Sequence, residues 1–296
     1  MAHALEKRAN LAGRRAVVVG GAVGIGRAVS LALAEAGVDV AFCDLDGAAI
    51  QSTSAEVAVL GRRVLGVIAD ATVPEQLRTF YEQVEAFFDG VEVVVNVVGG
   101  VLMEPLMDKS PESCADDIQR NFGYVIESTR HAVPLLRRSR GGACIINFTS
   151  IEAHRGAGGF AVYAGAKAAT TNFSKAMAWE LGPEGIRVNV IAPDTTDSAG
   201  NRKAMPERVQ AVNATVPLEW WAKAFEMYIP LRVPPSTDDL ANAVLFLASD
   251  LARSISGQVL HVDGGTGAAL GMMRWPNDGG ITLPVPAGNT LKKLFG

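Results

Sequence analysis

A short β-branched strand pattern that runs directly into a glycine-rich turn constrains this chain more than any other feature. Residues Ala16–Val19 are uniformly apolar, and the turn that follows, Gly20–Gly26, contains four glycines. Apolar residues then recur at helical spacing from Ile25 to Ala36, where Gly37 ends the pattern. A buried strand, a tight turn and a helix in this order are typical of the first unit of a parallel α/β sheet.

The alternation of strand and helix patterns continues along the 296-residue chain. Further strands are predicted at Val38–Cys43, Val64–Ile68, Val91–Val95, Ala143–Phe148, Arg187–Ile191 and Gln258–Val262, and helices at Ala48–Leu60, Glu75–Phe88, Ser113–Arg137, Val162–Leu181 and Asp238–Ala248. This order predicts an α/β fold with a doubly wound, mostly parallel sheet, a Rossmann fold, with helices on both faces. We expect one domain over residues 10–265 and a Gly- and Pro-rich C-terminal extension at 266–296.

Composition places the chain among ordinary globular proteins. Hydrophobic residues make up 49% of the sequence, charged residues 20%, and the formal net charge is -4. This balance gives no reason to expect a nucleic-acid partner or membrane association. The three cysteines are widely spaced, so we expect reduced thiols and no bound metal. No apolar run has the length of a signal peptide core or a membrane span, which predicts a cytoplasmic protein.

The glycine turn is a candidate phosphate-binding site. Glycines let a pyrophosphate approach the backbone, and the N-terminus of the following helix offers it unpaired N–H groups. Asp44, at the end of the second predicted strand, is placed to accept hydrogen bonds from the ribose hydroxyls of adenosine. A carboxylate there repels the 2′-phosphate of NADP, and neither Val23 nor Leu45 supplies a cation to offset it. NAD is therefore favoured over NADP. A plain tight turn and a solvated strand-end acid are the alternatives.

Four polar residues form a candidate catalytic group. Tyr163 and Lys167 are four residues apart on a predicted helix, so they share one face, and an ammonium near a phenol lowers the pKa of the phenol. A tyrosine tuned in this way can accept a proton from an alcohol. Ser150 follows a predicted strand at the sheet edge where ligands bind, and Asn121 lies in the long helix before that strand. A Tyr-x-x-x-Lys pair alone is also common as surface packing.

Taken together, these motifs resemble the short-chain dehydrogenase/reductase family over about residues 10–265. The match comprises the cofactor loop Gly20, Gly24 and Gly26, the Asp70-Ala71 pair expected to touch the adenine, the segment Asn96–Gly99, the tetrad Asn121, Ser150, Tyr163 and Lys167, and the closing segment Val262–Gly265.

The resemblance implies a role for each residue of the tetrad. Ser150 positions the substrate oxygen, Tyr163 exchanges the proton, Lys167 lowers the pKa of the tyrosine and binds the nicotinamide ribose, and Asn121 holds a water at a local backbone break. Cofactor contacts are expected from Gly20, Val23, Gly24, Ile25, Gly26, Asp44, Leu45, Asp70, Ala71, Asn96, Val97, Gly99, Tyr163, Lys167, Pro193, Thr195 and Ser198. No metal is needed in this scheme, and a homotetramer or homodimer is implied.

Three departures from the family pattern bear on cofactor binding. Val19 replaces a Thr before the first glycine, and Val97 and Val98 replace Asn and Ala. Asp194 replaces the Gly of a Pro-Gly pair, which puts an acid beside the nicotinamide pocket. None of these removes a member of the tetrad.

The substrate is indicated only in outline. Glu152, His154 and Arg155 follow Ser150 and can contact a polar substrate group, with Arg155 suited to a carboxylate, or they are solvated loop charges. Trp220, Trp221 and Phe225 fall in the expected substrate lid, residues 197–235, and suit a bulky apolar or cyclic secondary alcohol or ketone. The alternatives are an NADP-dependent ketone or 3-oxoacyl reductase, and a non-catalytic dinucleotide-binding protein.

Overall fold

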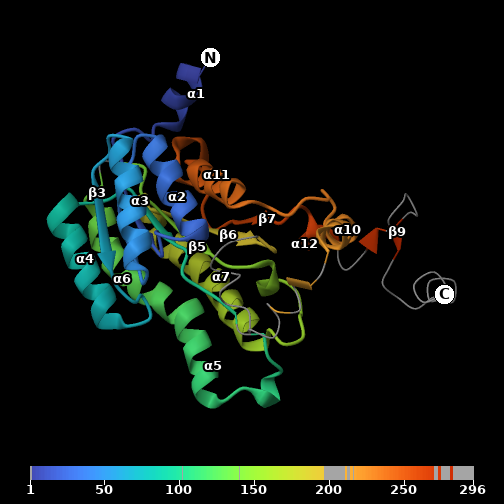
Figure 1. The fold of residues 1–296 in the computed structure, drawn as a ribbon. Coiled ribbons are helices and arrows are strands. Elements are labelled where there is room, and N and C mark those ends of the chain that lie inside the picture. Colours follow the sequence, from blue (N-terminus) through green and yellow to red (C-terminus); the bar gives the residue numbers. More distant parts are fainter. Residues whose placement is uncertain are drawn as a thin grey trace, which may run out of the picture.

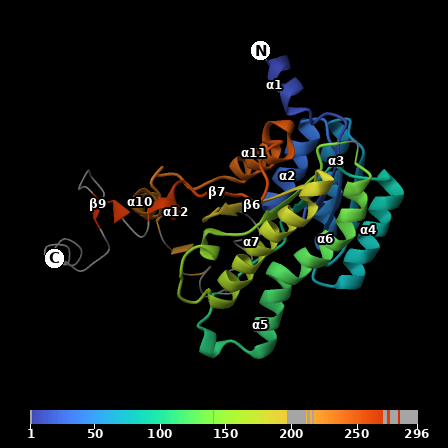
Figure 2. The ribbon, with the colours of Figure 1, turned by 180° about the vertical axis from the view of Figure 1, so that it is seen from behind.

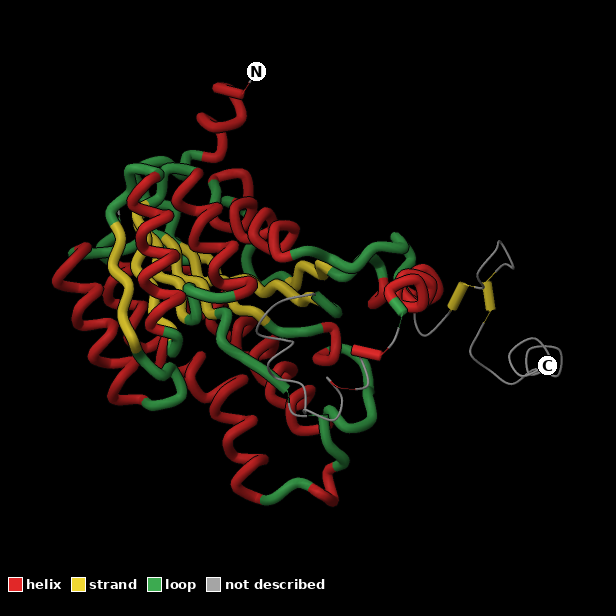
Figure 3. The backbone as a smooth tube through the Cα atoms, in the orientation of Figure 1, coloured by secondary structure: helices red, strands yellow, loops and turns green. Residues whose placement is uncertain are grey.

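The computed structural model describes residues 2–101, 103–139, 141–196, 211, 214–215, 217–269, 273–274 and 281–282. Its main sheet has the strand order β3-β2-β1-β4-β5-β6-β7, and all neighbouring strands are parallel. The strands are β1 (Arg15–Val19), β2 (Asp39–Asp44), β3 (Val64–Ile68), β4 (Val93–Asn96), β5 (Cys144–Phe148), β6 (Arg187–Pro193) and β7 (Val259–Val262). Figure 3 shows this sheet between two layers of helices.

Each face of the sheet carries its own hydrophobic core. One face is covered by α2 (Gly24–Glu35), α3 (Gly47–Val59) and α11 (Thr237–Ala248), which are nearest the viewer in Figure 1. The other is covered by α4 (Pro74–Phe88), α6 (Tyr124–Arg137) and α7 (Ala161–Leu181), seen from behind in Figure 2. Side chains alternate between the two cores along each strand; in β1, Val18 enters the first core, and Val17 and Val19 enter the second. Burial on both faces explains the uninterrupted apolar strands.

The remaining described elements lie around this framework. They are α1 (Ala2–Ala9), η1 (Leu106–Asp108), α5 (Pro111–Ile118), η2 (Gln119–Gly123), η3 (Ile151–Ala153), η4 (Gly182–Glu184), α10 (Leu218–Tyr228), η5 (Asp250–Ala252), α12 (Thr266–Ala269), β8 (Met273–Arg274) and β9 (Ile281–Thr282). In Figure 1, α1 projects from one end of the molecule, and α10 and α12 lie beyond the end of β7. No helix among the described residues is long and apolar enough to cross a membrane.

The predicted fold class is confirmed, with one difference in a helix. The residues predicted as a single helix, Ser113–Arg137, form α5, the π-helical turn η2 and α6 in direct succession. An apolar pattern does not report this change, because one widened turn leaves the helix continuous. The division at residue 265 stays a prediction. Large parts of the predicted lid (197–235) and of the extension (266–296) lie outside the described residues.

The sheet topology defines where a ligand binds. The chain runs outward from β1 through β2 to β3, then returns to β4 on the other side of β1. In open α/β sheets, ligands bind beyond the carboxyl ends of the strands at this reversal. Here those ends are Val19 of β1 and Asn96 of β4, which are paired in register.

Candidate active site

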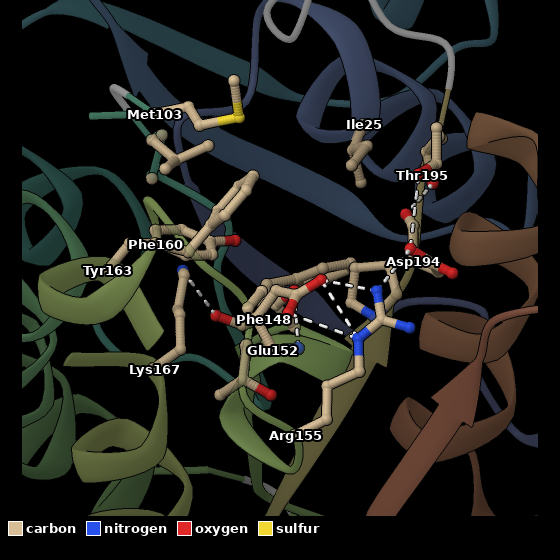
Figure 4. A pocket seen from close by; sticks show the side chains of 18 of the residues that line it. Ile25, Met103, Phe148, Glu152, Arg155, Phe160, Tyr163, Lys167, Asp194 and Thr195 are labelled. Carbon is tan, nitrogen blue, oxygen red and sulfur yellow. Dashed lines mark hydrogen bonds and ion pairs between the residues drawn. The ribbon is translucent and has the colours of Figure 1, made fainter. Parts of the chain in front are cut away.

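Two adjoining cavities lie at the carboxyl edge of the sheet, and both are lined by Ile25, Val97 and Gly99. The first, which we call the dinucleotide cavity, has a volume of about 420 Å³ and is lined by the glycine turn and the ends of β2 and β3. The second, the catalytic cavity, has a volume of about 540 Å³ and is lined by Ser150, Tyr163 and Lys167 among others (Figure 4). The arrangement suits a ligand that extends through both cavities.

The glycine turn brings its backbone close to the dinucleotide cavity. Gly20 has a φ of +88°, a conformation that favours glycine, and a Cβ on Gly26 would lie 1.7 Å from the carbonyl oxygen of Gly20. α2 begins at Gly24, and its N-cap residue, Val23, makes no side-chain hydrogen bond to the first turn. The first amides of α2 are therefore available to a phosphate group.

Asp44 is held in a fixed orientation at the edge of the dinucleotide cavity. Its Oδ2 accepts a hydrogen bond of 3.0 Å from the Ala22 amide, and its Oδ1 accepts one of 2.8 Å from the Leu45 amide. Each carboxylate oxygen keeps acceptor capacity beyond these single bonds. Asp44 also lines the cavity, so it can accept hydrogen bonds from a ribose.

Tyr163 and Lys167 project from α7 into the catalytic cavity, as their spacing predicts. The Lys167 ammonium donates a hydrogen bond of 3.0 Å to the carbonyl oxygen of Phe148, and its burial lowers its pKa to about 8. Ser150 follows β5, and its Oγ accepts a hydrogen bond from the Glu152 amide, 3.2 Å away. The carboxyl end of β5 and the helix α7 therefore meet at the catalytic cavity.

Burial raises the pKa of Tyr163, whereas hydrogen bonding with Ser150 lowers it and the charge of Glu152 raises it further. The net direction is opposite to the lowering that the Tyr163–Lys167 spacing predicts. The Lys167 Nζ lies 5.9 Å from the centre of the tyrosine ring. The loss of hydration at the buried phenol therefore outweighs the lowering by the hydrogen bond with Ser150.

Asn121 lies in the π-helical turn η2 and is fully buried. Its Nδ2 donates to the carbonyl oxygens of Gly100 (2.8 Å) and Asp117 (2.9 Å), and its Oδ1 accepts from the Gly100 amide (3.1 Å). Its own carbonyl oxygen accepts from Thr170 on α7, at 2.9 Å. The turn is the local backbone break that the resemblance implies, and the water-holding role of Asn121 stays a prediction.

The far wall of the catalytic cavity is a charged network. Arg155 pairs with Glu152 through Nη2–Oε1 at 2.6 Å and lies 3.8 Å from Asp194 Oδ1. Asp194 Oδ2 accepts hydrogen bonds from Tyr228 Oη (2.8 Å) and Thr266 Oγ1 (2.7 Å). Burial, and then the bond to Asp194, raise the pKa of Tyr228 to about 12, so its phenol stays protonated and acts as a donor. Figure 4 shows Glu152, Arg155 and Asp194 grouped on one side, away from Tyr163.

Comparison with known proteins agrees with this geometry. The model of the enoyl-(acyl carrier protein) reductase family matches residues 20–267. The chain belongs to the short-chain dehydrogenase/reductase family. It is thus an oxidoreductase of the kind that binds a nicotinamide cofactor.

Relatives of this short-chain dehydrogenase/reductase span most of its length. An uncharacterized oxidoreductase of Mycobacterium tuberculosis is 32% identical over 271 residues, 92% of this chain and 95% of the relative. A 3-oxoacyl-(acyl-carrier-protein) reductase of Escherichia coli is 33% identical over 258 residues, 86% and 98% of the two chains. A short-chain dehydrogenase/reductase of Serratia marcescens superimposes with a TM-score of 0.76 at 26% identity, covering 87% of this chain and 99% of that one.

Most of the predicted cofactor residues of this dehydrogenase/reductase line one of the two cavities. The dinucleotide cavity is lined by Gly20, Val23, Gly24, Ile25, Gly26, Asp44, Leu45, Asp70, Ala71, Val97 and Gly99, and the catalytic cavity by Tyr163, Lys167, Pro193 and Thr195. Asn96 lines neither; it is buried and hydrogen-bonded to Asn147 and Ser128, and its contact with the cofactor stays a prediction. Ser198 lies outside the described residues.

Most of the predicted substrate residues, in contrast, lie outside the lining of the catalytic cavity. Glu152 lines the catalytic cavity. His154 is outside its lining and faces His261 of β7 at 4.8 Å between ring centres, whereas Arg155 and Ala157, which follow it in the chain, line the cavity. Trp220, Trp221 and Phe225 of α10 also lie outside the lining; Trp220 is 60% exposed, and the rings of Trp221 and Phe225 contact each other. Of the aromatic residues of this helix, Tyr228 reaches the cavity wall through its bond to Asp194.

Sequence reasoning missed four residues that line the dinucleotide cavity: Cys43, Ala69, Thr72 and Arg120. The first three adjoin predicted residues at strand ends, so a one-residue extension of each motif finds them. Arg120 precedes Asn121 in the π-helical turn, far in sequence from the cofactor motifs. Its presence in the cavity follows from tertiary structure.

Proposed function

We propose that the protein interconverts a secondary alcohol and a ketone with NAD(H). The observation that carries this proposal is the convergence of Ser150, Tyr163 and Lys167 where an apolar cavity adjoins a dinucleotide cavity. A proton-exchanging group is therefore next to the position of a hydride donor or acceptor. Neither a structural protein nor a simple dinucleotide-binding protein needs that juxtaposition.

Asp44 supports NAD as the cofactor. Its carboxylate is fixed by two backbone amides and lines the cavity, so a 2′-phosphate at this position meets a negative charge. The residues that would hold the pyrophosphate are the glycine turn and the first amides of α2, and Lys167 would hold the nicotinamide ribose. When bound, the nicotinamide supplies a carbon that accepts or donates a hydride.

The chain's own groups then perform the proton chemistry. Ser150 donates or accepts a hydrogen bond at the substrate oxygen and orients the reacting carbon. In oxidation, the hydroxyl proton passes to the Tyr163 oxygen as the hydride leaves the carbon; in reduction, Tyr163 returns the proton to the forming alkoxide. The Lys167 ammonium stabilises the phenolate that oxidation requires, because a buried positive charge favours a nearby negative one.

The catalytic cavity supports a bulky, uncharged substrate. It has the volume of a typical small-molecule site, and its lining includes Val101, Met103 and Phe160. Arg155 is already paired with Glu152 and adjacent to Asp194, so a substrate carboxylate would add a third negative group to this wall. A cyclic or otherwise apolar alcohol fits this environment.

A second candidate is an NADP-dependent ketone or 3-oxoacyl reductase. It is favoured by relatives named as 3-oxoacyl-(acyl-carrier-protein) reductases at 32–33% identity. Asp44 argues against this candidate, because its carboxylate repels the 2′-phosphate of NADP.

Titration with NADH and NADPH, followed by nicotinamide fluorescence, tests the proposal. We expect NADH to bind at least tenfold more tightly, and Asp44→Asn to narrow that ratio. Asp46→Asn is the matched control, since Asp46 caps α3 and is not part of the cavity lining. Turnover of cyclic secondary alcohols with NAD would complete the case. Tighter NADPH binding, with turnover of 3-oxoacyl thioesters, would favour the second candidate instead.

We also propose a homotetramer or homodimer, as the family resemblance implies, with α7 in the interface. Trp179 on α7 is 86% exposed in the single chain, and Ile118 on α5 is 48% exposed. Large apolar side chains at this exposure are expected where a partner covers them. Light scattering of the purified protein, alone and with Trp179→Glu, tests this assembly.

A further inference from the structure

Arg120 places a cation in the dinucleotide cavity that none of the cofactor motifs supplies. It belongs to the π-helical turn η2 and is half-buried, and its side chain has no hydrogen bond or ion pair among the described residues. Asp44 and Asp70 line the same cavity, where Arg120 is the one basic residue within the described lining. A guanidinium that faces a cavity and lacks a partner is free to contact a ligand.

Neighbouring contacts locate Arg120 at one end of that cavity. Its Cδ lies 3.8 Å from the position that a Cβ on Gly100 would occupy, and the adjacent Gln119 donates from Nε2 to the Thr72 carbonyl oxygen at 3.1 Å. These contacts put the π-helical turn against Thr72, which follows Asp70 and Ala71 at the end of β3. The turn that carries Arg120 therefore adjoins the Asp70–Thr72 end of the dinucleotide cavity, where the sequence motifs predict the adenine.

The π-helical turn explains how neighbouring residues serve two sites. A π-turn accommodates one residue more than an α-turn, which alters the direction of successive side chains. Asn121 is buried against Gly100 beside the catalytic cavity, whereas Arg120 lines the dinucleotide cavity. An unbroken α-helix would shift this pair relative to Gly100.

We propose that Arg120 binds the adenine base of the cofactor, with its guanidinium plane against the ring. Adenine is uncharged at neutral pH and offers a π face and ring-nitrogen acceptors, which match a planar guanidinium. The Asp70 Oδ1 accepts from the amide and hydroxyl of Thr72, at 2.8 and 2.6 Å, so this carboxylate is held locally. The inference rests on the proposed function in one respect, that the cavity holds an adenine nucleotide.

The test compares ligands with and without the adenosine half. Dissociation constants are measured by fluorescence for NADH, NADPH and reduced nicotinamide mononucleotide, with the wild type, Arg120→Leu and Arg120→Lys. We expect Arg120→Leu to weaken NADH binding about tenfold and Arg120→Lys about three- to fivefold, because an ammonium lacks the planar surface. Binding of the mononucleotide should change less than twofold in both variants. Arg78→Leu is the matched control, since Arg78 pairs with Glu75 on the exposed face of α4 and is not part of the cavity lining.

The other outcomes overturn the inference in distinct ways. Equal NADH affinity in wild type and Arg120→Leu would show that the guanidinium makes no useful contact. A loss for NADPH at least tenfold greater than for NADH would show that Arg120 binds the 2′-phosphate. An equal loss of affinity for the mononucleotide would show that the substitution affects the cavity as a whole. Thermal unfolding of each variant shows whether it is folded. Failure of the wild type to bind NADH would instead contradict the proposed function.

Discussion

The ammonium of Lys167 donates a hydrogen bond to the carbonyl oxygen of Phe148, the last residue of β5, at 3.0 Å. This bond ties α7 to the carboxyl edge of the sheet and fixes the lysine beside Tyr163. The side chain is buried, with 3% exposure, and its pKa is lowered to about 8. A charge kept in this place is held at a cost to stability, which is typical of a functional site.

Replacement of Lys167 by Met should reveal that cost through its pH dependence. The unfolded lysine holds its proton up to about pH 10.4, whereas the folded one releases it near 8, so burial of the ammonium destabilises the fold below pH 8 and the penalty fades as pH rises towards 10. We expect the unfolding free energy of Lys167→Met, minus that of the wild type, to fall by about 2 to 3 kcal/mol between pH 7 and 10. Urea unfolding measures it. Lys175→Met, on the exposed side of α7, is the matched control.

Replacement of Tyr163 by Phe should separate chemistry from binding. Removal of the phenol oxygen removes the proton-exchanging group, so kcat should fall about 10² to 10⁴-fold. Because the ring stays in place, the dissociation constant for NADH should change less than about threefold. Tyr81→Phe is the control, as this buried tyrosine bonds to Ser128 within the second core. Retention of more than a tenth of the turnover by Tyr163→Phe would assign proton exchange to another group.

The pairing of Arg155 predicts discrimination against anionic substrates. Glu152 and Asp194 lie beside Arg155, so this part of the cavity wall has two carboxylates and one guanidinium. Its net charge is therefore negative. We expect kcat/KM for cyclohexanol to exceed that for 4-hydroxycyclohexanecarboxylate at least tenfold, and Arg155→Gln to widen the gap. A preference for the carboxylate that disappears in Arg155→Gln would identify the residue as an anion-binding group.

The fold was predictable because both faces of a parallel sheet are buried. Such strands are continuous apolar runs, and β5 (Cys144–Phe148), predicted at Ala143–Phe148, is buried at every residue. The π-helical turn at Gln119–Gly123 was not predictable from the apolar pattern, because the widened turn leaves the surrounding helical periodicity intact; only the family resemblance implied a backbone break at Asn121. Helix and strand patterns therefore locate the framework but not the local distortion that carries Asn121.

The site was predictable where its residues follow strand ends or share a helix face. Asp44 and the pair Tyr163–Lys167 are of this kind, and each lines its expected cavity. Arg120 was not, because it reaches the dinucleotide cavity through packing of η2 against the end of β3. The pKa of Tyr163 was misjudged for a related reason: spacing reports the nearby charge but not the burial that opposes it.

Replacement of Asp194 by Asn should loosen the contact between β6 and the segments beyond it. Two hydroxyl donors, from Tyr228 and Thr266, share one carboxylate oxygen of a side chain that is nearly buried. Hydrogen bonds to a charged acceptor are stronger than bonds to a neutral amide, so Asp194→Asn should lower the unfolding free energy by about 1 to 3 kcal/mol. Tyr228→Phe should lower it by about 1 kcal/mol. Because the two residues share a bond, the double variant should lose less than the sum of the single losses, as measured by urea unfolding. Strict additivity would mean that the Tyr228 hydroxyl contributes nothing through Asp194, and that α10 is held by packing alone.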